Sequence, residues 1–329
     1  MDFGALLQNS LAAALGPDAI VYALAAIGLN VHFGYTGLLN FGQAGFMAVA
    51  AYGLAASIAT WGLPFWLGIL IGLAAALLLA VLLGVPTLRL RADYLAIATI
   101  ASSEILRLVF GSVTLVDWFG GSNGRQGFAG DFYDLNPYNG RLDFGLFSFS
   151  RNDAWVFTVG WVLVALSCLV VWALMRSPWG RLLKSIREDE EAVRSLGKNV
   201  FAYKMQALIL GGMFGAIAGF MLALKQASVI PTDYATDITF FCYTALLIGG
   251  AGRVLGPVIG AIIFWFLLSF LGGFFTRAAA ADIIPSVIMT DTQASLVRFI
   301  LVGLGLMLLM IYRPQGIFGD RREIAIDGR

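Results

Sequence analysis

The sequence has little charge: Lys, Arg, Asp and Glu make up only 12% of its 329 residues. Soluble domains carry roughly 25% charged residues, so this chain cannot cover a globular surface with charge. Hydrophobic residues make up 59% of the chain, and the mean hydropathy is +0.84. The net charge of +1 gives no bulk attraction to nucleic acid. Composition therefore excludes a soluble globular domain and indicates that lipid is the solvent.

Histidine and cysteine are also scarce. His32 is the only histidine, and the two cysteines, Cys168 and Cys242, lie in apolar segments. These residues predict neither a metal site nor a disulfide framework. No nucleophile and base stand at a recognisable spacing around His32, so a membrane-embedded enzyme is the weakest functional hypothesis.

A Walker A motif for nucleotide phosphates is missing as well. Gly197 and Lys198 are followed by Asn199, and no glycine stands five residues before Gly197. We therefore expect that the chain does not hydrolyse ATP and binds no cofactor itself.

Long apolar runs make up most of the sequence. A helix needs roughly 20 apolar residues to cross a bilayer, and the alternating pattern of barrel strands is absent. The sequence predicts an all-α polytopic transmembrane bundle, one domain over residues 1–329, with about nine spans (eight to ten). The predicted spans are 12–33, 38–60, 64–86, 92–111, 155–175, 205–226, 238–253, 255–275 and 295–312.

Basic residues predict the orientation, because Lys and Arg favour cytoplasmic loops. They gather around Arg89, in 176–204, at Arg253 and in the tail 313–329, which all fall on one side when there are nine spans. We expect that side to be cytoplasmic and the N-terminus to be outside. The segment 112–153 then lies outside, and its length fits either a partner-binding loop or an irregular surface loop.

Small residues spaced four apart predict close helix packing within the membrane. The GxxxG patterns are Gly68 and Gly72; Gly211, Gly215 and Gly219; and Gly252, Gly256 and Gly260.

The segment 176–204 is the one long charge-dense stretch between apolar runs. Its centre predicts a short helix: acidic residues 188–191 precede it, Arg194 lies near its end, and Gly197 is placed as a C-terminal cap. Ala192, Val193 and Leu196 would form a small apolar face. Docking onto a soluble partner and a merely solvated loop are both open.

Polar residues at membrane depth are candidates for a solute path, because each costs free energy in lipid. Glu104 and Arg107 stand at i and i+3, so an ion pair between them is favoured over a direct solute contact. Two glycine-interrupted stretches, Gly34–Gly45 and Leu247–Pro257, predict broken helices, with a tight turn favoured for the second. The candidate path residues are Tyr35, Asn40, Gln43 and Glu104.

Six blocks in order resemble one family, the permease subunits of ABC importers for branched-chain amino acids, LivM type. The blocks are Gly28–Gly53, Leu88–Arg107, Gly120–Gly127, Arg176–Lys204, Ile248–Ala261 and Tyr312–Gly319. The resemblance covers nearly the whole chain. It implies a multi-pass protein of the bacterial inner membrane.

The resemblance also implies partners: a second permease subunit, two ABC ATPase subunits that hold ATP and Mg, and a periplasmic binding protein. The family carries a cytoplasmic coupling helix, whose pattern Glu191, Ala192, Val193 and Gly197 match, with Val193 in place of a second Ala; Leu196 completes the expected ATPase-facing surface. Arg125 departs from the outer-loop block, which leaves urea or short amides as alternative solutes. A gradient-driven secondary transporter is the remaining hypothesis.

Overall fold

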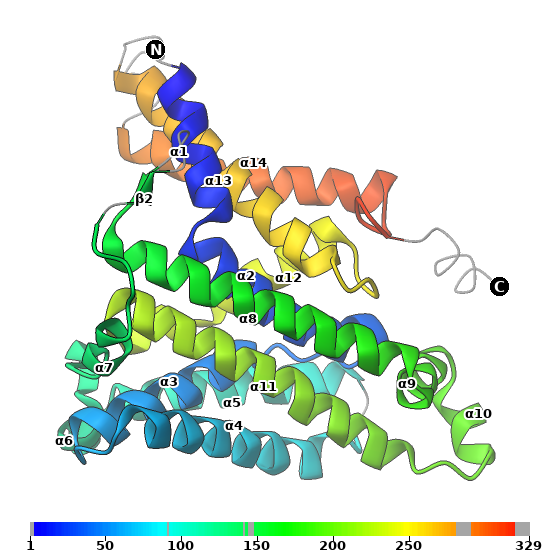
Figure 1. The fold of residues 1–329 in the computed structure, drawn as a ribbon. Coiled ribbons are helices and arrows are strands. Elements are labelled where there is room, and N and C mark those ends of the chain that lie inside the picture. The colour runs from blue at the N-terminus through cyan, green and yellow to red at the C-terminus, as the bar shows by residue number, and fades with distance from the viewer. Residues whose placement is uncertain (1–2, 91, 141, 144–147, 281–290, 320–329) are drawn as a thin grey trace.

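The computed structural model describes residues 3–90, 92–140, 142–143, 148–280 and 291–319. Helices dominate the described part of the chain (Figure 1). The longer helices are α1 (Phe3–Leu15), α2 (Pro17–Leu29), α3 (Gln43–Ala59), α4 (Phe65–Thr87), α5 (Ala92–Phe110), α8 (Arg151–Arg176), α9 (Pro178–Glu188), α11 (Val200–Gln226), α12 (Thr236–Gly249), α13 (Gly256–Ala280) and α14 (Asp291–Tyr312).

Short elements fill the connections between these helices. They are the π-helix η1 (Asn30–Tyr35), the 3-10 turns η2 (Val113–Leu115), η3 (Gly121–Asn123) and η4 (Pro231–Tyr234), the helices α6 (Val116–Phe119), α7 (Gly130–Asp134) and α10 (Glu190–Ser195), and the strands β1 (Arg125–Gln126), β2 (Leu142–Asp143), β3 (Ser148–Phe149) and β4 (Ser228–Val229). Two antiparallel pairs form, β1 with β4 and β2 with β3.

Every predicted span contains a helix. Among the described residues, five helices are long and apolar enough to cross a membrane: α1 continuing through α2 and η1, α4, α8, α11 and α13. Helix α5 and residues 113–119, with a bend of 60° between them, form a broken span or a re-entrant loop, and α3, α12 and the described apolar part of α14 are shorter. A polytopic helical membrane bundle is the observed architecture.

Three of the differences from the predicted spans have a clear cause in the backbone. The first span lies across α1, α2 and η1, with a break at Gly16 where Pro17 starts α2. The second starts at Gln43 instead of 38, because the chain between Gly37 and Gly42 is not helical. The seventh ends at Gly249, because Gly250 has a φ of +109°, which a helix does not accept.

The described parts of the four basic segments gather at one end of the bundle. The turn after α4 borders a cavity with α9 and α10, and the turn after α12 borders a groove with the end of α8. The tail after α14 reaches the same groove through Phe318. Helices α6 and α7 lie at the opposite end (Figure 1).

Helix α11 packs against α2 and α3 along its glycines. A Cβ at Gly211 would collide with the His32 ring, one at Gly215 would lie 2.6 Å from Nε2 of Gln43, and one at Gly219 would lie 2.7 Å from Cα of Met47. Such distances require glycine, since Cβ atoms do not approach heavy atoms below 3.0 Å. The predicted GxxxG packing is therefore present on this face of α11.

Two buried tyrosines predict opposite responses to the same substitution. The Tyr52 hydroxyl is buried with no hydrogen-bond partner among the described residues, whereas the Tyr243 hydroxyl donates to the Asn40 carbonyl at 2.9 Å. We expect Tyr52→Phe to raise the free energy of unfolding by about 1 kcal/mol and Tyr243→Phe to lower it by a similar amount. Thermal unfolding of both variants in the same detergent checks this, and equal destabilisation by the two would contradict it.

Candidate functional site

The first predicted helix break lies between η1 and α3. The π-helix η1 widens the last turn of α2, and π turns of this kind are frequent at functional sites. The chain then leaves helical geometry at Gly37, whose φ is +73°, and returns to it at Gln43. Residues 37–42 thus form an unwound segment. The amides of Gly37, Leu38 and Asn40 donate to backbone carbonyls, and side chains accept from the amides of Phe41 and Gly42.

The side chains of His32 and Asn40 make hydrogen bonds that hold this segment in place. The Nε2 atom of His32 lies 3.1 Å from the Leu208 carbonyl, and its Nδ1 atom lies 3.0 Å from the Asn40 amide nitrogen. A carbonyl can only accept, so Nε2 carries the proton and Nδ1 accepts from Asn40. This arrangement assigns a neutral imidazole that ties the unwound segment to α11.

Gln43 completes the network at the start of α3. Its amide donates to the carbonyls of Ala25 at 3.3 Å and Gly211 at 3.2 Å, while Asn40 Oδ1 accepts from the Gly42 amide at 2.9 Å. Asn40 and Gln43 are both fully buried. In this conformation the two side chains are packed among α2, α3 and α11, and neither faces an open cavity.

The second predicted break, between α12 and α13, is a tight turn, and it touches the first. The Asn30 side chain accepts from the Gly252 amide at 2.8 Å and donates to the Arg253 carbonyl at 2.8 Å. A Cβ at Gly34 would lie 2.6 Å from the Gly252 nitrogen. The side chain of Asn30 therefore joins the two breaks.

The remaining two path candidates lie apart from this network. The Tyr35 ring is 2% exposed and lies 5.7 Å from the Lys184 ammonium. Glu104 lies on α5, where it accepts from Arg107 at 2.9 and 2.5 Å, as the i, i+3 spacing predicted. The opposite face of α5 meets the unwound segment, where the Phe41 amide donates to Thr99.

Helix α10 is capped at both ends. The sequence predicted Gly197 as the C-terminal cap, whereas it placed Asp189 only among the acidic residues at the start of the helix. The Asp189 side chain accepts from the Ala192 amide at 2.9 Å. At the other end Gly197 has a φ of +75°, its amide donates to the Arg194 carbonyl at 3.0 Å, and the next amide, of Lys198, donates to the Val193 carbonyl. These two bonds form a Schellman motif, which fixes where α10 stops.

The structure corrects one member of the expected ATPase-facing surface. Val193 is 5% exposed and packs into the core, so its side chain is not available to a partner. Leu196 is 78% exposed, and Glu191, Ala192 and Gly197 are exposed beside it. We define the outward surface of α10 as these four residues.

Side-chain bonds fasten α9 and α10 to the bundle. The Arg187 guanidinium of α9 donates to the Gly34 carbonyl at the end of η1. Glu190 of α10 accepts from Lys204 of α11 and from Arg194 at 2.9 Å. A cavity of about 250 Å³ is lined by residues of α9 and α10 together with residues of the unwound segment. The charged segment is thus in direct contact with the broken helix.

The described part of the segment 112–153 is folded against the far end of the bundle. Strand β1 pairs with β4 directly after α11, Tyr133 donates to the Leu224 carbonyl at 2.7 Å, and Trp155 donates to the Phe132 carbonyl at 2.9 Å. The Arg125 side chain bonds the carbonyls of Asp117 and Trp118 within the same segment. Arg125 therefore has a structural role in this surface. Among the described residues, no group of three or more His, Cys, Asp or Glu could hold a metal ion.

Sequence reasoning missed Asn30, His32 and Arg187. The sole histidine beside a glycine-rich break was a visible signal for His32. Asn30 and Arg187 gave no signal, because their partners lie 222 and 153 residues away along the chain.

Known proteins match this chain over most of its length. Residues 13–291 match the family described as branched-chain amino acid transport system / permease component. The high-affinity branched-chain amino acid transport system permease protein LivM of Escherichia coli K12 is 31% identical over 91% of this chain and 68% of its own length. A probable LivM of Methanocaldococcus jannaschii is 24% identical over 92% of this chain and 91% of its own length.

A solved structure, PsaBC from Streptococcus pneumoniae in complex with Fab, aligns over 89% of this chain and 91% of that chain, at 18% identity and a TM-score of 0.37. The family match spans the helices from α2 to α13, and with them both breaks and the capped helix α10. The chain therefore belongs to the permease components of branched-chain amino acid transport systems.

Proposed function

We propose that this chain is a membrane subunit of an ATP-driven importer of branched-chain or other hydrophobic amino acids. The observation that carries the proposal is α10: a helix capped at both ends that exposes Leu196 and is bonded to the broken helix through its neighbour α9. The chain carries no Walker A motif of its own. An exposed apolar surface on a charged loop then fits an ATPase partner.

The partners in this proposal are two ABC ATPase subunits at α10, a second permease subunit and a periplasmic binding protein. ATP and Mg reside on the ATPases, and this chain binds neither. The segment 176–204 and the tail 313–329 face the cytoplasm, and the N-terminus and 112–153 face outside. The folded contacts of 112–153 with α11 support a docking role there, since they give a partner a defined surface.

The bonds around α9 suggest how ATP binding on the ATPases changes the conformation of the membrane helices. Closure of the ATPase pair displaces α10, and the contact of Glu190 with Lys204 passes that displacement to α11. The bond from Arg187 to the Gly34 carbonyl passes it to η1 and the unwound segment. Bistable packed elements of this kind convert small shifts into larger rearrangements.

The solute is an amino acid with a branched apolar side chain, as the names of the relatives suggest. Urea and short amides are the alternatives within the same family. Tyr35, Asn40, Gln43 and Glu104 remain the candidate path residues. Asn40 and Gln43 reach a solute only after the buried network opens, because their polar atoms are engaged with one another and with backbone carbonyls.

A secondary transporter is the second candidate, and the pair of broken helices favours it. Glu104 does not strengthen it, because its carboxylate is paired with Arg107 on the same helix. Purified chain alone and purified complex in liposomes separate the two functions. We expect uptake of radiolabelled leucine only by the complex and only with enclosed ATP, with an inactive ATPase variant as the control. Gradient-driven uptake by the chain alone would overturn the importer proposal.

A further inference from the structure

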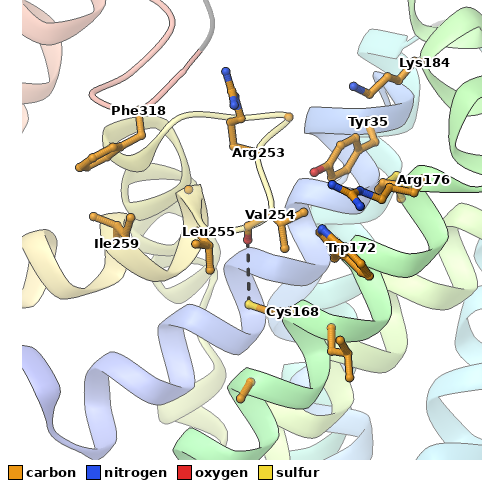
Figure 2. Close-up of a pocket in the computed structure, with 15 residues that line it drawn as sticks. Tyr35, Cys168, Trp172, Arg176, Lys184, Arg253, Val254, Leu255, Ile259 and Phe318 are labelled. Atoms are coloured by element: carbon orange, nitrogen blue, oxygen red, sulfur yellow. Dashed lines mark hydrogen bonds between the residues drawn. The ribbon is translucent and has the colours of Figure 1, made fainter.

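Four aromatic rings pack together at the α6–α7 end of the bundle. Tyr52 of α3 stacks on Phe110 of α5 with ring centres 4.2 Å apart, and Phe119 of α6 meets these two rings edge-on at 5.8 and 5.0 Å. The Tyr234 ring of η4 lies 6.3 Å from the Tyr52 ring. We call these four residues the aromatic cluster. It lies at the opposite end of the bundle from the groove between α8 and the turn into α13 (Figure 2).

Both tyrosine hydroxyls of the aromatic cluster are buried and unpaired. Tyr52 is 0% exposed and Tyr234 is 1% exposed, and neither hydroxyl has a hydrogen-bond partner among the described residues. Buried tyrosine hydroxyls usually have a partner, because an unpaired one has given up its hydrogen bonds to water without compensation. Phenylalanine would fill the same space without that cost. The two hydroxyls therefore point to a role beyond the packing of this conformation.

A row of buried polar side chains leads from the first helix break toward the aromatic cluster. Thr99 and Ser103 of α5 are both buried at the contact with α3. Thr99 accepts from the Phe41 amide of the unwound segment, and a Cβ at Gly45 would lie 3.2 Å from Ser103. Phe110 continues the same face of α5, seven residues after Ser103. Buried polar residues at membrane depth mark solute paths, so the α3–α5 contact has the character of one.

We propose that Tyr52 and Tyr234 bind the transported solute where its path opens at the α6–α7 end. The inference rests on the import function proposed above and adds a contact site between α3, α5 and η4. The two hydroxyls form hydrogen bonds with the polar head of the amino acid, and the rings of Phe110 and Phe119 contact its apolar side chain.

The solute reaches this site only after η4 moves away from α3 and α5, because the hydroxyls are fully buried here. Strands β1 and β4 contact α3 beside the aromatic cluster, and η4 follows β4 directly. A partner docked on the segment 112–153, which carries β1, is therefore adjacent to the elements that cover the site.

A double variant, Tyr52→Phe with Tyr234→Phe, removes both hydroxyls and keeps both rings. Leucine uptake is measured with the assembled complex in liposomes, with enclosed ATP and leucine-loaded binding protein. We expect uptake to fall about tenfold, because two hydrogen bonds to the solute are lost. The melting temperature of the complex should rise by about 2 °C or more, because two unpaired buried hydroxyls are gone. A purely structural role would not move uptake and stability in opposite directions.

Tyr22→Phe is the matched control. It removes a hydroxyl from another group of aromatic rings, in which Tyr22 of α2 meets Phe264 and Trp265 of α13. Uptake by this variant should equal that of the unaltered complex. An equal loss of uptake in the control and the double variant would overturn the inference, because the effect would then not be specific to the aromatic cluster.

The remaining outcomes separate this inference from the importer function. Unchanged uptake by the double variant would overturn the inference alone. A lower melting temperature would also overturn it, because the hydroxyls would then be hydrogen-bonded in the folded complex, for example to water. The importer function survives both results, since the unaltered complex still takes up leucine. Absence of ATP-driven uptake by the unaltered complex would instead overturn the importer function and this inference together.

Discussion

Leu196→Asp is expected to abolish ATP-driven uptake while the chain still folds and inserts. Leu196 is 78% exposed on α10 and contributes little to the core, so the folded chain tolerates a carboxylate there. In contact with an ATPase, the same carboxylate would be buried without a partner. Central apolar contacts in interfaces cost about 2 kcal/mol or more when they are removed, so assembly with the ATPases should weaken at least thirtyfold.

Leu196→Met is the matched control, because it keeps an apolar side chain of similar volume at the same position. Co-purification of the ATPases and uptake by reconstituted complex are the measurements. Normal assembly and uptake by the Asp variant would show that α10 does not contact the ATPase. Failure of both variants would place the effect in the fold of α10 and would also contradict the interface role.

Gly211→Val is expected to prevent accumulation of folded protein. A Cβ at this position would collide with Nε2 of His32 and lie 2.5 Å from the backbone carbonyl oxygen of Gly28. The backbone of α2 cannot yield as a flexible side chain does, so α2 and α11 must separate. Their separation breaks the bonds from His32 to Leu208 and from Gln43 to Gly211, each buried. We expect a loss of more than about 4 kcal/mol, which few single substitutions reach.

Gly303→Val provides the comparison at an exposed position. Gly303 lies on α14 and is exposed, and a Cβ added there would meet no heavy atom within 4 Å. Its substitution should leave the yield of monodisperse protein nearly unchanged. Size-exclusion chromatography and thermal unfolding in detergent measure both variants. Equal yields from the two would mean that close approach at Gly211 does not limit folding.

The helices were predictable because each apolar run is long enough to require a helix in lipid. The C-terminal cap of α10 was predictable for a local reason, because the Gly197 amide donates to the Arg194 carbonyl three residues before it. The N-terminal cap is equally local, since Asp189 accepts from the Ala192 amide, but it was not predicted. The inward direction of Val193 was not predictable, because two adjacent apolar residues do not say which of them meets the core. That choice depends on where α11 lies.

The polar network at the first break was predictable only in part. The glycines and Asn40 indicated that the helix stops, and the structure has the unwound segment there. The partners that satisfy it are distant in sequence, since His32 bonds a carbonyl 176 residues away and Gln43 one 168 residues away. No local pattern encodes such a pairing. The break in the helix could therefore be predicted, but the hydrogen bonds that hold the unwound segment could not.

The bridge made by Asn30 has a consequence for the order of events during transport. Its one amide group holds both the Gly252 amide and the Arg253 carbonyl, so neither break can rearrange without giving up bonds to the other. A state with one break open and one closed would leave several buried polar atoms without partners, each costing about 1–3 kcal/mol. We therefore expect such half-open states to be sparsely populated and the permease to act as a switch with two positions. A switch of this kind would limit leakage of small ions during the turnover of the larger solute.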